Sequence, residues 1–403
     1  MALMPVADAL ANVLAGVMPL GPEQTGLRFA QGRTLSHALT AALTHPPFDG
    51  SAMDGYAVRA SDIQVLPSTL RVIGEAAAGW PFGGTVGHGE AVRIFTGAPV
   101  PDGADAVVIQ ENTTAAHGHV TISEAAAKGD HIRPRGQDFH EGDAILTRGR
   151  LLNARDLLLA AAAGHAMLAL VKRPVVAILA TGDELVEPSD RPAAGEIVAS
   201  NSYGIAALVE AAGGTAKLLG IANDDEGDLA AKIKDASCAD ILVTTGGASV
   251  GDHDLVRPAL EAAGATLHFY KIAMRPGKPV FFGTRPGCAG TQRIVGLPGN
   301  PVAAMIGARV FLVPLIAALL GRTAATPLVS AELTVPLAAN GAREHFMRAT
   351  LFTGHAGARV TPLANQDSSL VSAFAAANCL IVVPADAPAM SAGQRVSVMP
   401  LDF

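Results

Sequence analysis

The hydrophobic pattern of the chain changes period several times, and each change separates one predicted region from the next. Over residues 1 to about 42, apolar residues recur at helical spacing, and the same spacing returns over residues 153–171. Two distant helical segments that pack together would explain this repetition. Residues 46 to about 135 instead contain short β-prone runs, such as AVRIFTG and AVVIQENT, between Gly and Pro turns. This texture predicts an inserted antiparallel β-barrel or sandwich.

From Arg173 onward, β-prone and helical stretches alternate, which predicts a parallel sheet covered by helices on both faces. The predicted strands are VVAILA, TAKLLGIA, DILVTT and RIVGL, and the predicted helices are YGIAALVEAAG, EGDLAAKIKDA, HDLVRPALEAAG and a long apolar helix after RIVGL. After Gly321 and Pro327 the runs become short and β-prone again, as in HFMRATLF and CLIVVP. A separate C-terminal β domain is therefore expected.

These regions predict a multidomain fold of the α/β plus β class. The boundaries are placed at residues 1–45 with 136–172 for a discontinuous helical and strand domain, 46–135 for the inserted small β domain, 173–324 for a three-layer α/β/α domain, and 325–403 for the C-terminal domain. The length of 403 residues agrees with this division, because a typical domain has roughly 150 residues.

Composition restricts the class of protein and its partners. Half of the residues are apolar and 16% are charged, which is typical of a soluble globular chain with an ample core. The net charge of -7 argues against nucleic acid or an anionic membrane as the main partner. The longest uncharged apolar run, residues 157–171, is shorter than the ~20 residues that span a bilayer, so no membrane segment is expected.

The N-terminus and the cysteines bear on localisation. The apolar N-terminal stretch has no basic leader and contains Asp8, which a signal peptide would avoid. Cys238, Cys288 and Cys379 are widely separated and form no C-x-x-C pair, so neither a zinc knuckle nor a disulfide framework is expected. Both features indicate a cytoplasmic protein.

Candidate chemistry lies in the loops after the predicted parallel strands, because ligands of open α/β sheets bind beyond the carboxyl ends of the strands. Four such loops are polar, and between them they carry glycine, hydroxyl and acidic residues: 181–184, 223–225, 245–249 and 297–301. Their backbone N–H groups can receive an anion, which predicts a phosphorylated ligand, and the adjacent acids suggest a divalent cation. In the alternative interpretation the glycines near residue 246 form an ordinary strand-to-helix turn, and Asp252 and Asp254 are surface acids.

The stretch FYKIAMRPGKPVFFG predicts a hairpin that carries three cations, Lys271, Arg275 and Lys278, within eight residues. Next to loops that can receive an anion, this cluster predicts a phosphate clamp, and solvated surface charges are the alternative. The sequence contains neither G-x-G-x-x-G nor a Walker A motif, which argues against dinucleotide-binding and P-loop enzymes.

Several motifs give the chain a family resemblance. The stretches are PPFDGSAMDGYAVR, RIFTGAPVPDGADAVVIQEN, IRPRGQDFHEGDAIL, LATGDEL, NSYGIAALVEAAGG, DILVTTGGASVGDHDLV, KIAMRPGKPVFFG and VGLPGNPVAA. In this order the chain resembles, over essentially its whole length, the molybdopterin molybdenumtransferases, the MoeA-type molybdenum insertases related to the E domain of gephyrin. SAMDGYAVR and MRPGKP are the specific motifs, whereas TGDEL or LPGNP alone would be weak.

The resemblance implies an elongated helical and strand domain with an inserted β domain, a molybdopterin-binding α/β domain and a C-terminal β-barrel. It implies a homodimer whose active cleft lies where the α/β domain of one subunit meets the inserted domain of the other. The implied reaction takes adenylylated molybdopterin and molybdate, uses Mg²⁺, and releases AMP and the molybdenum cofactor. Other molybdenum cofactor biosynthesis proteins and recipient molybdoenzymes are further expected partners.

The resemblance also implies roles for acidic and hydroxyl residues. Asp54 and Thr96 would form the partner subunit's wall of the cleft, although a turn-forming Asp and a strand Thr are the simpler interpretations. Glu184, Asp225 and Asp254 would lie around phosphate and metal, whereas charges that favour a helix N-terminus are the alternative for the first two. Asp224 could exchange roles with Asp225.

The remaining implied site residues bind anions or shape loops. Lys271 and Arg275 would receive the oxyanion or phosphate, and Pro298 and Pro301 would shape the adjacent loop. The further substrate-binding positions are Thr245, Gly246, Gly247, Ser249 and Lys278, together with a second anion-contacting pair, Arg348 and Ser368, in which Ser369 could replace Ser368.

Two other function classes are possible. A non-catalytic scaffold of the same fold could lose Asp54, Asp254 or Lys271, and this chain keeps all three. A molybdopterin adenylyltransferase would consume ATP with molybdopterin alone, and the flanking β domains argue against that shorter type of enzyme.

Overall fold

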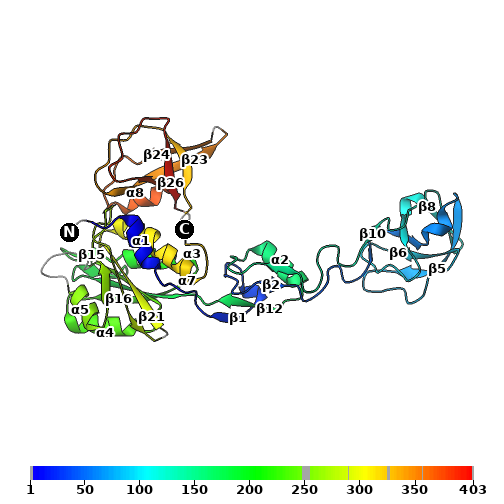
Figure 1. Ribbon diagram of the computed structural model, residues 1–403, viewed down its shortest axis with the longest axis horizontal. Helices are drawn as coiled ribbons and strands as arrows, with labels where there is room; N and C mark the ends of the chain where they lie inside the picture. Colours follow the sequence, from blue (N-terminus) through cyan, green and yellow to red (C-terminus); the bar gives the residue numbers. More distant parts are fainter. Residues whose placement is uncertain (1–2, 247–254, 289, 325–326, 356, 402–403) are drawn as a thin grey trace. The chain divides into compact units, whose positions relative to one another are not determined.

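The computed structural model of the chain describes residues 3–246, 255–288, 290–324, 327–355 and 357–401 (Figure 1). It consists of two compact units. The first comprises Met1–Glu23, Gly32–Ser36 and Leu170–Phe403, and the second comprises Gln24–Gln31 and His37–Ala169. Among the predicted site residues, Gly247, Ser249 and Asp254 lie outside the described residues.

The first unit contains an α/β domain built on a six-stranded sheet. The strand order is β16 (Thr215–Ala222), β13 (Val175–Thr181), β17 (Ile241–Thr245), β21 (Gly290–Leu297), β20 (Phe281–Gly287) and β18 (Thr266–Phe269). The first four of these strands run parallel, as the alternating pattern predicts. The expectation of an all-parallel sheet is wrong at β20, which is antiparallel to both neighbours because a short hairpin joins it to β21.

Helices cover both faces of this sheet (Figure 1). On one face lie α3 (Asn201–Ala212), α6 (Pro301–Gly307), the π-helical turn η4 (Ala308–Leu312) and α7 (Val313–Leu319), and on the other lie α4 (Glu226–Asp235) and α5 (Val256–Ala262). The short pair β14 (Leu185–Val186) and β15 (Ile197–Val198) follows β13. Strand β17 is buried along its whole length, as a strand with helices on both sides must be.

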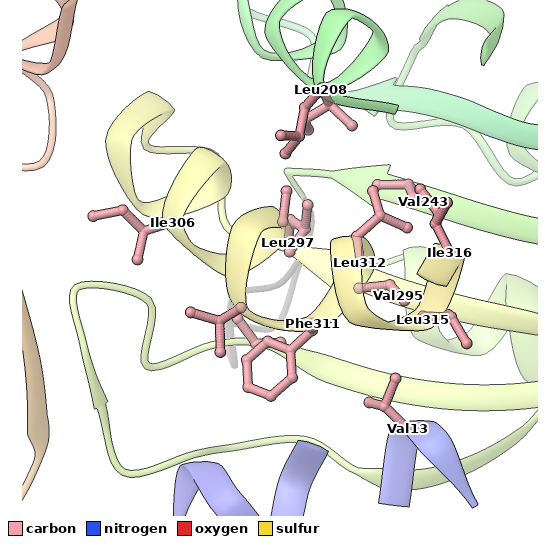
Figure 2. Packing of buried hydrophobic residues seen from close by; sticks show 14 of the residues in the cluster. Val13, Leu208, Val243, Val295, Leu297, Ile306, Phe311, Leu312, Leu315 and Ile316 are labelled. Atoms are coloured by element: carbon pink, nitrogen blue, oxygen red, sulfur yellow. The ribbon is translucent and has the colours of Figure 1, made fainter. Parts of the chain in front are cut away.

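The main hydrophobic core lies between the sheet and its longest helix. Figure 2 shows Leu312 and Ile316 packed with Val243 and Val295 of the sheet. The continuous helix Pro301–Leu319 is long and apolar enough to cross a membrane by composition, but 78% of its apolar window is buried inside the domain. Such burial is typical of a core helix.

The N-terminal region differs from its helical expectation. Only Val6–Leu14 forms a helix, α1, and its buried Val6, Ala9 and Val13 join the core of the α/β domain. The expectation that the two distant segments meet as packed helices is wrong, because α1 lies in the α/β core whereas the second helix, α2 (Ala154–Ala162), belongs to the other unit. Residues 22–26 and 167–171 of the same two segments instead pair as strands. Proline and glycine between residues 16 and 22 stop the helix despite the continuing apolar spacing.

The C-terminal domain is a closed barrel, which the strand-rich pattern predicts only as a β domain. Its strands follow the order β23 (Glu344–Gly354), β24 (Gly357–Pro362), β22 (Val329–Leu333), β26 (Arg395–Pro400) and β25 (Cys379–Val383), and β25 pairs again with β23. The helix α8 (Val371–Ala376) lies between β24 and β25 in the sequence. A two-residue strand of the α/β domain, β19 (Met274–Arg275), pairs in parallel with β23.

The second unit contains the inserted β domain, a six-stranded sheet. The order is β7 (Ala106–Ile109), β4 (Gly55–Val58), β6 (Glu90–Ile94), β5 (Ser68–Ala76), β9 (His119–Ile122) and β8 (Thr113–Ala116). Strands β5 and β6 run parallel, so the expectation of a purely antiparallel domain is wrong there. Separate hydrophobic clusters include the buried Ile63 and Ile94.

Short elements complete the unit and its connections. The two-stranded pairs are β2 (Leu39–Thr40) with β11 (Ala144–Leu146), β3 (Gly50–Ser51) with β10 (Ile132–Arg133), and β1 (Pro22–Gly26) with β12 (Met167–Val171). Three 3-10 turns are η1 (Leu27–Phe29), η2 (Ala60–Ile63) and η3 (Gln110–Asn112). Asn153 begins α2 with a capping box, in which its side chain accepts from the Asp156 backbone while the Asp156 side chain accepts from the Asn153 backbone.

Candidate active site

The described residues of the four polar loops meet at the carboxyl edge of the parallel strands, as the sequence predicts. The Gly182 N–H donates to the Ala222 carbonyl at 3.2 Å, and the Gly246 N–H donates to the Leu297 carbonyl at 3.3 Å. The Asp224 N–H donates to Asp183 Oδ1 at 2.8 Å. These bonds join each loop to a neighbour, so the described groups that are predicted to receive an anion lie at one edge of the sheet.

Only glycine fits at position 246, because the loop after β17 passes close to the backbone at the end of β13. Its φ of +90° is in the left-handed region, and a Cβ at this position would lie 2.3 Å from the Thr181 carbonyl oxygen. Thr245, the residue before it, is buried at the end of β17. Packing of the chain alone therefore accounts for the glycine at position 246, without a ligand.

The acidic residues of these loops have different surroundings. Asp225 is the N-cap of α4, where its Oδ1 accepts from the Asp228 N–H at 2.9 Å. Glu184 is exposed, and its carboxylate fills the space that a side chain at position 182 would need. The capping interpretation therefore holds for Asp225, as the local helix signal indicated.

A magnesium site can be tested on the donor set of the described residues. Among them, no group of three or more His, Cys, Asp or Glu side chains is placed to hold a metal ion. Glu184 and Asp225 therefore do not fit a complete Mg²⁺ site by themselves, since Mg²⁺ requires a near-octahedral oxygen shell.

The predicted cation cluster is exposed and lies beside the helix after β21. Lys271, Arg275 and Lys278 are all exposed, and no ion pair of theirs occurs among the described residues. The Ile272 N–H donates to the Lys278 carbonyl, which closes the segment into a compact loop. A Cβ at Gly277 would lie 3.7 Å from the Ala303 carbonyl oxygen, so the loop packs against the first turn of α6.

The LPGNP loop lies at the same helix start. Pro298 is buried, and Pro301 occupies the first helical position of α6, where its missing N–H costs no hydrogen bond. Asn201 was not among the residues predicted for the site, yet its Nδ2 donates to the Gly299 carbonyl at 2.7 Å. The NSYG motif at the start of α3 was the available sequence signal for this contact.

The barrel contributes Ser368 to the same region. Its carbonyl accepts from the Val302 N–H at 3.1 Å, in the first turn of α6. The Ser369 N–H at 2.9 Å and the Ser369 hydroxyl at 2.8 Å both donate to Asp367 Oδ1, and these two bonds hold the pKa of Asp367 below its usual range. Because Ser369 is bonded within its own turn, the geometry favours Ser368 of the two serines.

Arg348 is buried, with only 1% of its surface exposed. Its guanidinium donates to the carbonyls of Leu370 at 3.3 Å and Asn365 at 3.1 Å, and its backbone bonds with Gln366 in both directions. Burial lowers the pKa of this guanidinium. In the described residues Arg348 therefore clamps the loop that carries Ser368.

Asp54 and Thr96 form a direct pair in the inserted domain. The Thr96 N–H and the Thr96 hydroxyl both donate to Asp54 Oδ1 at 2.8 Å. These two bonds, together with the nearby charge of Arg93, hold the pKa of Asp54 below its usual range. The pair joins the two motifs DGYAVR and IFTGAP, which the sequence predicts to act together.

A separate groove of about 680 Å³ lies between α4 and α5. It is lined mainly by alanine and proline, with Lys234, Glu226 and Arg285 at its walls. None of the predicted site residues lines it. The groove is therefore distinct from the carboxyl-edge loops.

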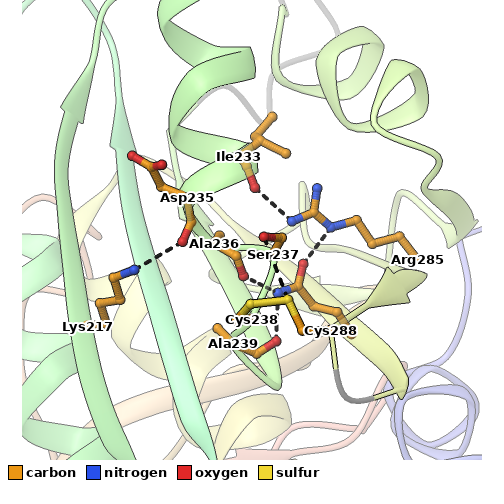
Figure 3. Close-up of a disulfide and its surroundings, with 10 residues drawn as sticks. Lys217, Ile233, Asp235, Ala236, Ser237, Cys238, Ala239, Arg285 and Cys288 are labelled. Atoms are coloured by element: carbon orange, nitrogen blue, oxygen red, sulfur yellow. Dashed lines mark hydrogen bonds between the residues drawn. A yellow bond between two sulfur atoms is a disulfide. The ribbon is translucent and has the colours of Figure 1, made fainter.

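The cysteines contradict the expectation that none is paired. Cys238, after α4, forms a disulfide with Cys288 in the turn between β20 and β21 (Figure 3). The two residues are 50 positions apart in the sequence, which hid the pair, but the Cys288 N–H donates to the Ser237 carbonyl at 3.1 Å. Cys379 is the buried free cysteine. The cysteines therefore no longer argue for a reducing compartment.

Comparison with known proteins shows three successive family matches along the chain. The MoeA N-terminal region (domain I and II) matches residues 4–164, the "Probable molybdopterin binding domain" matches residues 177–318, and the MoeA C-terminal region (domain IV) matches residues 330–401. Fold and site thus define a multidomain protein of the MoeA class with a molybdopterin-binding α/β domain.

Curated relatives extend this similarity to almost the whole chain. The molybdopterin molybdenumtransferase of Haemophilus influenzae is 37% identical over 389 residues, 95% of this chain and 95% of that protein. That of Nostoc sp. is 38% identical over 323 residues, 78% of this chain and 74% of that protein. The chain belongs to the molybdopterin molybdenumtransferase family, and it is therefore a transferase of molybdenum cofactor biosynthesis.

Solved structures agree with this assignment. Two crystal structures of the molybdopterin biosynthesis MoeA protein from Pyrococcus horikoshii superpose with TM-scores of 0.87 and 0.82, at 28% and 27% identity. They cover 100% and 99% of this chain and 100% of each neighbour. The similarity therefore includes the barrel and the inserted β domain as well as the α/β domain.

Proposed function

We propose that this enzyme inserts molybdenum from molybdate into adenylylated molybdopterin and releases AMP together with the molybdenum cofactor. The proposed site lies at the carboxyl edge of β13, β16, β17 and β21. The anion-binding loops would be shaped by small, hydroxyl and proline residues, namely Thr245, Gly246, Gly247, Ser249, Pro298 and Pro301. Glu184, Asp225 and Asp254 would supply carboxylates, and dependence on Mg²⁺ is expected from the family resemblance alone.

One observation carries this proposal. Lys271, Arg275 and Lys278 are exposed cations on a loop that packs against the first turn of α6, next to Pro298 and Pro301. Solvated surface charges would not need this fixed backbone position. An anion is therefore the fitting ligand for the cluster.

The charges of the substrates explain why such a cluster is needed. Molybdate is a dianion, and adenylylated molybdopterin carries phosphate groups and dithiolene sulfurs. Bringing these groups together costs electrostatic energy, because like charges repel strongly wherever water is excluded. Lys271 and Arg275 reduce this repulsion by fixed positive charge, and they would stabilise charge that builds up as the phosphoryl link to AMP breaks.

The barrel side of the site adds a second place for an anion. Ser368 lies next to the α6 helix start, and Arg348 holds its loop through backbone carbonyls. We place molybdate entry at Ser368, with Arg348 contributing charge and loop geometry. Lys278 and Arg275 are the exposed cations of the facing loop.

The proposed assembly is a cytoplasmic homodimer. Asp54 and Thr96 of one subunit would complete the cleft of the other, and Asp54 would act as an ionised carboxylate there. The chain would receive its substrate from, and pass its product to, other molybdenum cofactor biosynthesis proteins and recipient molybdoenzymes. Its acidic net charge is consistent with neither nucleic acid nor an anionic membrane as a partner.

AMP release from adenylylated molybdopterin, measured with and without molybdate, tests the proposal. We expect release that depends on molybdate and is accompanied by molybdenum bound to the pterin. Consumption of ATP with molybdopterin alone would instead indicate an adenylyltransferase. Absence of both reactions in the folded protein would favour a scaffold and contradict the proposed function.

A further inference from the structure

Arg93 lies at the centre of the structure that supports Asp54. This residue is in β6, where it stands opposite Tyr56 of β4. Its guanidinium carbon is 5.1 Å from the Tyr56 ring centroid and 5.0 Å from the Phe95 ring centroid. Contact with two aromatic rings holds the guanidinium in place, because a cation is attracted to the electron-rich face of a ring.

The hydrogen bonds of Arg93 lead back to Asp54. Arg93 Nη1 donates to the Gly55 carbonyl at 3.2 Å, and Arg93 Nη2 donates to Gln110 Oε1 at 2.7 Å. The Gln110 N–H in turn donates to the Asp54 carbonyl at 3.0 Å. Arg93 therefore closes a ring of contacts through Gly55, Gln110 and Asp54.

Thr96 completes the support from the other side of the turn. Both of its donors converge on Asp54 Oδ1, whereas Asp54 Oδ2 takes part in no hydrogen bond among the described residues. One carboxylate oxygen is thus fixed and the other is left for a further partner. The backbone on which this carboxylate stands is fixed by Arg93 and Gln110.

We infer that Arg93 is a positioning residue for Asp54 and holds the Asp54 carboxylate at the place that the reaction requires. The inference rests on the proposed function, because it is there that Asp54 takes part in the chemistry. Arg93 itself would not contact substrate. Its effect would pass through the Gly55 and Gln110 contacts and through its positive charge.

Electrostatics supports the geometric argument. Charged residues on the elements around this turn include Glu90 and Arg93 of β6, Arg59 at the end of β4 and Glu111 of η3. Of these, Arg93 is the charge that helps to lower the pKa of the Asp54 carboxyl, after the two Thr96 hydrogen bonds. Removing the positive charge should therefore raise this pKa, so that the carboxylate becomes protonated at a higher pH.

Arg93→Met is the main test, with the full-length protein and AMP release as the assay. We expect kcat to fall on the order of a hundredfold with KM changed by less than about threefold, because a misplaced group costs about this much in rate. The acid limb of the pH profile should move to higher pH. Arg93→Lys keeps the positive charge, so the acid limb of its pH profile should stay near that of the parent. Its kcat should still fall, because lysine lacks the planar guanidinium that makes two directed hydrogen bonds.

Gln110→Leu is the second variant, because it removes only the acceptor of the Arg93 bond and leaves all ionisable groups. We expect a smaller fall in kcat with an unchanged pH limb. Arg71→Met is the matched control: Arg71 lies on the same sheet and pairs with Glu90, away from the Asp54 turn. It should keep the parent kcat and pH profile.

A direct measurement separates this inference from the proposed function. Carbon-13 NMR of aspartate-labelled protein, with the Asp54 signal assigned by its loss in Asp54→Asn, gives the pKa of Asp54 without any turnover. A raised pKa in folded Arg93→Met supports the inference even if no variant releases AMP. An unchanged Asp54 pKa, or a folded Arg93→Met protein with kcat within threefold of the parent, would overturn it.

Discussion

Arg275 of β19 and His345 of β23 stand opposite each other in parallel register. The pairing joins the cation loop of the α/β domain to β23 of the barrel, and the Glu344 N–H extends it by donating to the Ala273 carbonyl at 2.9 Å. Any shift of the barrel would therefore move Arg275. This connection would let residues from two domains act at the proposed anion site.

The same pairing leaves His345 in an unusual environment. Only 8% of its surface is exposed, and burial together with the charges of Arg275, Arg343 and Arg348 lowers its pKa to about 4. Since an unfolded His titrates near 6.5, the unfolded state binds a proton first as pH falls. Stability supplied by neutral His345 is therefore complete above about pH 6.5 and is lost as pH falls towards 4.

We accordingly predict that His345→Gln reduces the loss of stability between pH 7.5 and pH 5 by about 2 kcal/mol. Urea unfolding at the two pH values measures this difference. His355→Gln, an exposed histidine after the same strand, is the control and should leave the pH dependence unchanged. Equal pH dependence in the parent and His345→Gln would show that His345 does not stay neutral in the folded protein.

Lys271→Gln tests the anion cluster. We expect binding of adenylylated molybdopterin to weaken by about 1.5 to 3 kcal/mol, the size of a charge-assisted hydrogen bond, with little change in Tm because Lys271 is exposed. Lys217→Gln is the control in the same domain, since Lys217 Nζ donates to the Asp235 carbonyl at 3.0 Å. Unaltered affinity combined with a lower Tm would make Lys271 a structural residue.

The Cys238–Cys288 disulfide should contribute to stability mainly by restricting the unfolded chain. It closes a loop of 50 positions, and replacing both cysteines by serine should lower the free energy of unfolding by about 2 to 4 kcal/mol. Denaturant unfolding of the double variant, compared with the parent under non-reducing conditions, measures this. The parent in reducing agent should lose the same amount, and equal stability in all three samples would contradict the prediction.

The sequence predicted the α/β sheet well because its periodic signals are local. A run such as VVAILA must be buried on both faces, and its position before a helical stretch places the following loop at the carboxyl edge of the sheet. The Gly246 region was found for the same reason. The strands of the barrel were also predicted, because Gly and Pro turns separate them.

Features that depend on contacts between distant segments could not be predicted in this way. The apolar spacing of Val6–Leu14 would suit packing on α2 as well as on the α/β core, so only the structure shows that it packs on the α/β core. Cys238 and Cys288 become neighbours only when the β20–β21 hairpin turns towards α4. The family motif indicated Asp54, whereas the role of Arg93 depends on a ring of contacts that has no sequence period.

The proposed dimer can be tested through an exposed leucine. Leu158 of α2 is 73% exposed although the helix buries Ala160 on its other side. If Leu158 lies in the subunit interface, Leu158→Glu should weaken the dimer by about 2 kcal/mol, roughly thirtyfold in Kd, without unfolding the chain. Sedimentation at nanomolar to micromolar concentration measures the equilibrium.

Activity gives the decisive comparison, because Asp54 and Thr96 are proposed to serve the cleft of the partner subunit. AMP release by Leu158→Glu should fall at concentrations where the protein is monomeric and return where it is dimeric. Val65→Glu is the control, since Val65 is 81% exposed in the inserted β domain, and it should change neither property. A monomer of either the parent or Leu158→Glu that is fully active at nanomolar concentration would mean that each subunit carries a complete site, and the shared cleft would have to be abandoned.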